Sequence, residues 1–247
     1  MIKKILKAVK ERVLIYRIKR YLHLKLGIKK ELQDYSIGIY EEAILYKLLD
    51  CFKIDSFFQI GIGDPDLLRD PFYNYLKRKK INGVVVEPHP TLYKKLEKYY
   101  RHDIKLNCLV DSKDEIKKNF FFVGQKYLNL YEDYVKTIST TNKDHLINCK
   151  VLPDHILNIP LSTKTIKKIM EENNIKKFDI LLIDVEGAEF DIIKSFLIDS
   201  SFKPLIIFEW RHVPKKKLLE LLEYMEQEFG YKFVIFKSDI LCYLKLS

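Results

Sequence analysis

The chain has 247 residues, of which 47% are hydrophobic, and a formal net charge of +10. A chain of this length buries roughly 70–75% of the surface that its unfolded form exposes, so it needs no disulfide framework to form a core. Its four cysteines are far apart and form no Cys-x-x-Cys pair. This spacing indicates reduced thiols and favours a cytoplasmic protein.

The excess positive charge lies in an N-terminal arm. Residues 1–30 contain eleven lysines or arginines and one acidic residue, whereas the rest of the chain contains 33 basic and 33 acidic residues. A basic amphipathic helical arm is predicted over residues 1–35, because apolar residues recur there at near-helical spacing. Such an arm suits an anionic membrane surface, a partner such as a glycosyltransferase, or its own domain. The neutral main body argues against nucleic acid as the partner.

Alternating helices and strands are predicted for residues 36–247. In chain order we expect a helix over 39–52, a strand over 56–60, a helix over 70–79, a strand over 84–86, a helix over 91–100, a strand over 104–110, a helix from Ser162 or Thr163 to about 173, a strand over 179–183, a helix over 188–197, a strand over 203–208, a helix over 214–229 and strands over 232–236 and 240–246. This order predicts an α/β fold with a Rossmann-like, doubly wound, mostly parallel sheet and a C-terminal antiparallel hairpin, preceded by the helical arm. No apolar run is long enough for a signal peptide or a membrane span, so we expect a cytoplasmic protein, either free or peripheral at the membrane.

The segment over 113–160 is less regular. It combines aromatic clusters with the polar patch Ser139-Thr-Thr-Asn142. We interpret it as an insertion that covers the mouth of a crevice and forms an acceptor pocket. A simple extension of the sheet is the alternative.

Two features near the first strands are typical of nucleotide binding. Gly61-Ile-Gly63 follows the first strand, and two glycines there permit a tight turn and the close approach of a ligand to the backbone. Glu87 ends the second strand, where nucleotide-binding folds hold ribose hydroxyls. Asp111 and Ser112 end the third strand and should lie beside the same crevice.

Carboxylates crowd the end of the strand over 179–183, which is apolar enough to be buried on both faces. Asp184, Glu186 and Glu189 follow it within six residues. Capping of the next helix is one interpretation. Three acids at the carboxyl end of a parallel strand favour a ligand site instead.

The motifs Asp184-Val-Glu-Gly-Ala-Glu189 and Val86-Glu-Pro-His-Pro90 are the most specific in the chain. With them, the sequence from about Phe57 to the C-terminus resembles the FkbM family of class I S-adenosylmethionine-dependent methyltransferases. The resemblance implies methyl transfer to a hydroxyl, often of a sugar in a glycan or a natural product. It implies that these residues bind S-adenosylmethionine: Gln59, Gly61, Gly63, Glu87, Pro88, Asp111, Ser112 and Asp184. The sequence departs from the family pattern at Gln59, where an acid is usual, and at Pro65, where a small residue is usual.

Methyl transfer to a sugar hydroxyl requires positioning and a base. We hypothesise that Asp184 or Glu186 orients or deprotonates the acceptor, and that Glu209 and His212, after the neighbouring strand, assist. The acids could also hold a divalent cation such as Mg²⁺, but no spacing requires a metal.

Three other functions are consistent with parts of the sequence. A nicotinamide-dependent oxidoreductase should have a third glycine where Asp66 stands, so it ranks below the methyltransferase. A nucleic-acid-modifying or nucleic-acid-binding protein would use the basic arm. A methyltransferase-like fold without activity would act as an interaction module.

Overall fold

The computed structural model describes residues 43–66, 71–235 and 238–244. The chain divides into two units, residues up to 54 with 71–79 and residues 55–70 with 80–247, and each is described by itself. The predicted arm over 1–35 lies outside the described residues, and so does Asp70, the predicted start of a helix.

The smaller unit contains a helix described over 43–49 and α3 (Pro71–Lys79). The rings of Tyr46 and Tyr75 lie 5.3 Å apart, and the Tyr75 hydroxyl donates a hydrogen bond to Asp50 Oδ1 at 3.2 Å. These contacts join the two helices of this unit. The end of α3 agrees with the prediction from the sequence.

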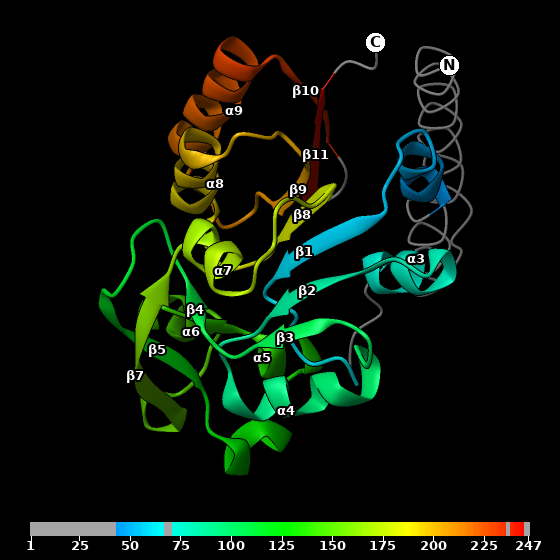
Figure 1. Ribbon diagram of the computed structural model, residues 1–247. Helices are drawn as coiled ribbons and strands as arrows, with labels where there is room; N and C mark the ends of the chain where they lie inside the picture. The colour runs from blue at the N-terminus through cyan, green and yellow to red at the C-terminus, as the bar shows by residue number, and fades with distance from the viewer. Residues whose placement is uncertain (1–42, 67–70, 236–237, 245–247) are drawn as a thin grey trace, which may run out of the picture. The chain divides into compact units, whose positions relative to one another are not determined.

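The larger unit is built on a seven-stranded sheet (Figure 1). Across the sheet the strands are β10 (Tyr231–Ile235), β11 (Asp239–Leu244), β9 (Leu205–Glu209), β8 (Ile180–Ile183), β1 (Ser56–Ile60), β2 (Asn82–Val86) and β3 (Ile104–Leu106). The strands β9, β8, β1, β2 and β3 run parallel, while β11 is antiparallel to both β9 and β10. The predicted mostly parallel sheet with a C-terminal antiparallel hairpin is therefore confirmed.

Helices cover both faces of this sheet. They are α4 (Pro90–Tyr99), α7 (Ile166–Glu172), α8 (Glu189–Asp199) and α9 (Lys215–Phe229). Phe58 and Leu181 share one core cluster with residues of α7, α8 and α9, which lie along one side of the sheet in Figure 1. Gln59 points to the opposite face, where the Tyr100 hydroxyl at the end of α4 lies 3.5 Å from its Oε1. In the described ranges no helix is both long and apolar enough to cross a bilayer.

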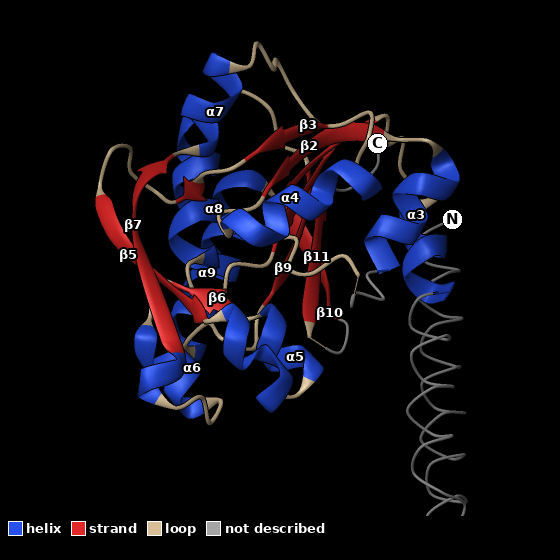
Figure 2. Cartoon of the chain, turned by 90° about the horizontal axis from the view of Figure 1, so that it is seen from below, coloured by secondary structure: helices blue, strands red, loops and turns tan. Residues whose placement is uncertain are grey.

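A second, four-stranded sheet lies beside the first (Figure 2). Its strands are, in order, β4 (Leu109–Val110), β7 (Ile156–Lys164), β5 (Lys117–Val123) and β6 (Ser139–Thr140). Between them lie η1 (Gln125–Leu130), α5 (Asp133–Thr137), α6 (Lys143–Asn148) and η2 (Pro153–His155). Val123, Val135 and Leu146 belong to a small core of their own. The segment over 113–160 is thus more regular than its sequence indicated.

The predicted strand over 104–110 is wrong, because it consists of two strands in different sheets. The Asn107 amide donates to the carbonyl oxygens of Glu87 at 2.7 Å and Pro88 at 3.1 Å. This side chain ties the chain to the end of β2, so pairing with β2 stops there and the chain turns into β4.

Strand β2 begins at Asn82, two residues before the predicted strand over 84–86. Gly83 pairs with Phe57 of β1, and a Cβ atom at Gly83 would lie 2.0 Å from the Phe57 carbonyl oxygen. Glycine is therefore required by the close approach of the two strands.

Helix α7 begins later than predicted, because Ser162 and Thr163 belong to β7. The Thr163 hydroxyl is buried, donates to the Lys113 carbonyl oxygen at 2.6 Å and accepts from the Ile116 N–H at 3.1 Å. Thr165 caps the helix instead, since its hydroxyl accepts a backbone N–H of the first turn.

Replacing Thr163 by valine keeps the side-chain shape but leaves the two backbone partners of the hydroxyl unpaired. We expect the free energy of unfolding to fall by about 1–3 kcal/mol, measured by chemical denaturation. The exposed Thr141→Val variant is the control and should change stability by less than about 0.5 kcal/mol. Equal stability of the two variants would contradict a structural role for the Thr163 hydroxyl.

Candidate active site

A cleft opens at the carboxyl ends of β1, β2 and β8, where open α/β sheets bind their ligands. Its lining includes Ile60, Gly61, Ile62, Gly63, Glu87, Pro88, Leu109, Val110, Asp111, Phe120, Thr137, Ser139, Thr140, Thr141, Asp184 and Glu186. A second hollow has a volume of about 340 Å³, compared with about 90 Å³ for the cleft. It is lined by α7, α8 and the loops before β8 and β9. That hollow lies at the amino ends of the strands, away from the glycine turn and the acidic loop, so we place the candidate site in the cleft.

The glycine turn packs directly against the acidic loop. Gly61 has a φ of +76°, and its N–H donates to the Val86 carbonyl oxygen at 3.0 Å. On the other side, the Asp184 N–H donates to the Ile60 carbonyl oxygen at 2.9 Å. A Cβ atom at Gly61 would lie 1.8 Å from the Asp184 carbonyl oxygen. Only glycine satisfies both the left-handed backbone and this close approach.

Glu87 shapes the glycine turn. Its Oε2 accepts from the N–H groups of Ile62 at 3.0 Å and Gly63 at 3.1 Å, and its Oε1 accepts from the His89 N–H at 2.8 Å. The side chain is 1% exposed, and burial raises its pKa to about 7 despite these donors. Glu87, the residue predicted to bind ribose, therefore already accepts three backbone hydrogen bonds, two of which fix the glycine turn.

The other predicted cofactor residues divide between the cleft and the core. Pro88 and Asp111 line the cleft. The Asp111 carboxylate accepts from the Ser112 N–H at 2.7 Å and is also paired with Lys118. Ser112 and Gln59 are not among the lining residues, and Gln59 is buried in β1 towards α4.

The three acids of the loop after β8 have different surroundings. Glu189 is fully buried, and its carboxylate accepts from the Val185 N–H at 3.1 Å and the Gly187 N–H at 3.0 Å, so it holds the loop in shape. Asp184 and Glu186 line the cleft instead. Glu186 has a φ of +58°, a strained backbone of the kind that collects at functional sites.

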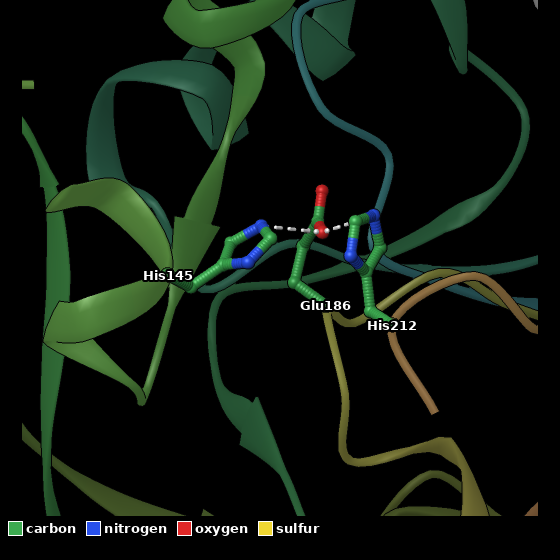
Figure 3. Close-up of side chains that lie close together, drawn as sticks. All are labelled: His145, Glu186 and His212. Atoms are coloured by element: carbon green, nitrogen blue, oxygen red, sulfur yellow. Dashed lines mark ion pairs between the residues drawn. The ribbon is translucent and has the colours of Figure 1, made fainter. Parts of the chain in front are cut away.

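Two histidines contact the Glu186 carboxylate from different elements (Figure 3). The Nε2 atoms of His145 and His212 lie 3.1 Å and 3.3 Å from Glu186 Oε2, and their rings meet edge to face at 4.6 Å. His212 Nε2 also lies 3.5 Å from Glu209 Oε2. Three predicted catalytic residues, Glu186, Glu209 and His212, are thus brought together, with Asp184 next to them.

Negative charge accumulates in this group. Burial, followed by the charge of Glu186, raises the pKa of Glu209 to about 7. The same two causes, in that order, raise the pKa of Asp184 well above its usual value of 3.8, although its side chain is open to the cleft. Glu186 in turn raises the pKa of His145. Carboxylates with displaced pKa values in a cleft are typical of functional sites.

The sequence matches the methyltransferase FkbM domain over residues 50–233. The chain belongs to this family. The matched span contains the glycine turn, the acidic loop and all the residues of the cleft named above. No curated protein matches the chain.

The FkbM match makes the protein a methyltransferase. It favours this function over the oxidoreductase alternative that the sequence left open. In this domain the parallel pairing of β1 and β8 sets Ile60 beside Ile183 at the strand ends. This pairing positions the acids that follow β8.

Sequence reasoning missed His145. It lies on α6, far in sequence from both Glu186 and His212, so no motif spacing reveals it. The one local signal was the polar patch Ser139-Thr-Thr-Asn142, because Asn142 caps α6. That cap determines where the helix begins and hence which residue faces Glu186.

Replacing Gly61 by alanine should lower the free energy of unfolding by more than the left-handed backbone at this position accounts for. Gly230 has a similar φ of +74° with nothing within 4 Å of an added Cβ, so Gly230→Ala is the matched control. We expect Gly230→Ala to lower the free energy of unfolding by about 1 kcal/mol. Gly61→Ala should lower it by about 1–3 kcal/mol more, because of the overlap with Asp184. Equal losses, measured by chemical denaturation, would refute the close approach.

Proposed function

We propose that this FkbM-family protein is an S-adenosylmethionine-dependent O-methyltransferase that methylates a sugar hydroxyl of a glycan or glycoconjugate. The observation that carries the proposal is the convergence of the glycine turn with Asp184 and Glu186 in one cleft. A binding turn and candidate bases thus lie next to each other, as transfer between a bound cofactor and an acceptor requires.

The cleft has the character of a nucleoside site. Ile60, Ile62 and Phe120 provide apolar walls for a base, whereas Glu87 and Asp111 provide carboxylates beside them. S-adenosylmethionine would supply an electrophilic methyl group on a sulfonium. Ser139 and Thr141, from the second sheet and the loop after it, add hydroxyl groups that suit a polyhydroxylated acceptor.

In the proposed reaction the chain positions the acceptor hydroxyl and removes its proton. Asp184 or Glu186 would accept the proton of the acceptor hydroxyl, and the hydroxyl oxygen would then take the methyl group that bound S-adenosylmethionine would supply. Glu209 and His212 assist from the end of β9, since His212 Nε2 lies within 3.5 Å of both Glu186 and Glu209 oxygens.

Calorimetric titration of the full chain with S-adenosylmethionine tests the cofactor. We expect micromolar binding. Thr141→Trp places a bulky ring at an exposed position of the cleft lining and should weaken binding at least tenfold, or about 1.4 kcal/mol. Asn148→Trp, at an exposed position of α6 that does not line the cleft, should leave binding unchanged.

No binding at millimolar cofactor by the folded protein would overturn this proposal. The interaction-module alternative would then lead, and the Gln59 and Pro65 departures would be its explanation.

Replacing Asp184 by asparagine tests the base. With methyl-labelled S-adenosylmethionine and a panel of free and nucleotide-linked sugars, we expect turnover to fall by about 10²–10⁴-fold. Calorimetric titration of the same variant separates loss of the base from loss of cofactor affinity, because the family resemblance also places Asp184 among the cofactor residues. The exposed Asp199→Asn variant is the control. Full turnover by Asp184→Asn would remove Asp184 from the base role and leave Glu186.

The basic arm stays a prediction, because residues 1–42 lie outside the described part of the chain. We propose that it directs the enzyme to an anionic membrane surface or to a glycosyltransferase that presents the acceptor.

A further inference from the structure

Three side chains from separate segments aim ring nitrogens and a carboxylate oxygen at one point. His145 comes from α6, Glu186 from the loop after β8 and His212 from the loop after β9 (Figure 3). Their ligand atoms all lie within 4.8 Å of one another. The side chains of His145 and Glu186 are only 15% and 18% exposed, whereas that of His212 is 34% exposed, so the group opens to solvent on the side of His212.

The contacts within this group are not ordinary hydrogen bonds. His145 Nε2 and Glu186 Oε2 approach to 3.1 Å, yet neither atom has a hydrogen-bond partner among the described residues. Two buried polar atoms that face each other without a hydrogen bond are costly unless a further group lies between them or beside them.

The spacing fits a shared metal ion. Ligand bonds of about 2.0–2.2 Å place neighbouring ligand atoms roughly 3.0–3.4 Å apart in octahedral or tetrahedral sites. The observed separations of 3.1 Å and 3.3 Å from Glu186 to the two histidines fall in this range. Each imidazole presents Nε2, the more common ligand atom, towards the same carboxylate oxygen.

The charge of the surroundings also favours a cation. The carboxylates of Asp184, Glu186 and Glu209 lie within 4.8 Å of one another. In the part of the chain that the structure describes, Glu186 and Glu209 form their ion pairs with histidine and not with lysine or arginine. A divalent ion would neutralise this group at its centre.

We propose that His145, Glu186 and His212 bind one divalent transition-metal ion, with the Glu209 carboxylate, 3.5 Å from His212 Nε2, as a neighbouring negative charge. Two imidazoles and one carboxylate suit Zn²⁺, Fe²⁺, Co²⁺, Ni²⁺ or Mn²⁺, whereas Mg²⁺ prefers oxygen ligands alone. The ion would link α6, next to the second sheet, to the loops at the carboxyl ends of β8 and β9 in the main sheet. Its use in catalysis rests on the proposed function: it would bind the acceptor hydroxyl and ease transfer of the hydroxyl proton to Asp184.

Metal binding is measured directly, without cofactor or acceptor. The full chain is freed of metal with a chelator and titrated with Zn²⁺, Mn²⁺ and Co²⁺ by calorimetry, and Co²⁺ absorption in the visible range reports the ligand set. We expect one ion per chain at micromolar affinity or tighter. His145→Ala and His212→Ala should each weaken binding by about 100-fold or more, since loss of a supporting partner alone costs 10–100-fold. His102→Ala, at an exposed position outside the cluster, should bind as the unaltered protein does.

Three results would overturn the metal site: no binding below about 1 mM for all three ions, unchanged affinity in both histidine variants, or a Co²⁺ spectrum that Glu186→Gln does not alter. Circular dichroism verifies folding, and His145→Gln replaces His145→Ala if the alanine variant unfolds. If S-adenosylmethionine binds while no metal does, the methyltransferase proposal stands and the metal site is refuted. If metal binds while the cofactor does not, the metal site stands and the proposed function fails.

Discussion

The parallel pairing of β1 with β8 is the constraint on which the rest of this site depends. It sets Ile60 beside Ile183, so that the glycine turn and the acidic loop leave the sheet at the same point. The backbones then touch: the Asp184 carbonyl oxygen occupies the space that a side chain at residue 61 would need. Contact between the backbones of the glycine turn and the acidic loop therefore shapes the FkbM cleft and determines where its side chains lie.

The acids of this methyltransferase have two kinds of surroundings. Glu87 and Glu189 are buried, and their carboxylate oxygens accept hydrogen bonds from backbone N–H groups. These bonds fix the glycine turn and the acidic loop. Asp184 and Glu186 face the cleft and repel each other there. The buried carboxylates thus stabilise the two loops. The acidic loop in turn holds Asp184 and Glu186 close together despite their mutual repulsion.

The second sheet completes the site. Its strands β5 and β6 bring Phe120 and Thr140 to the cleft, and helix α6 brings His145 to Glu186, which lines the cleft. This segment has a small core of its own around Leu146, next to His145, so the position of the histidine ring is set by local packing as well as by Glu186. A segment that is independently packed can hold an acceptor or an ion without disturbing the main sheet.

The sequence by itself determined the elements that depend on local signals. A short, mostly apolar segment marked β1, and an uninterrupted apolar run marked β8. Gly230 marked the end of α9, and the acidic string of residues 184–189 marked the functional end of the sheet. Only the tertiary structure decided the rest. Asn107 ends β3 through contacts with Glu87 and Pro88, and His145 meets Glu186 across the fold. Such contacts join residues far apart in the chain, and no periodicity or spacing encodes them; they exist only once the sheets have packed.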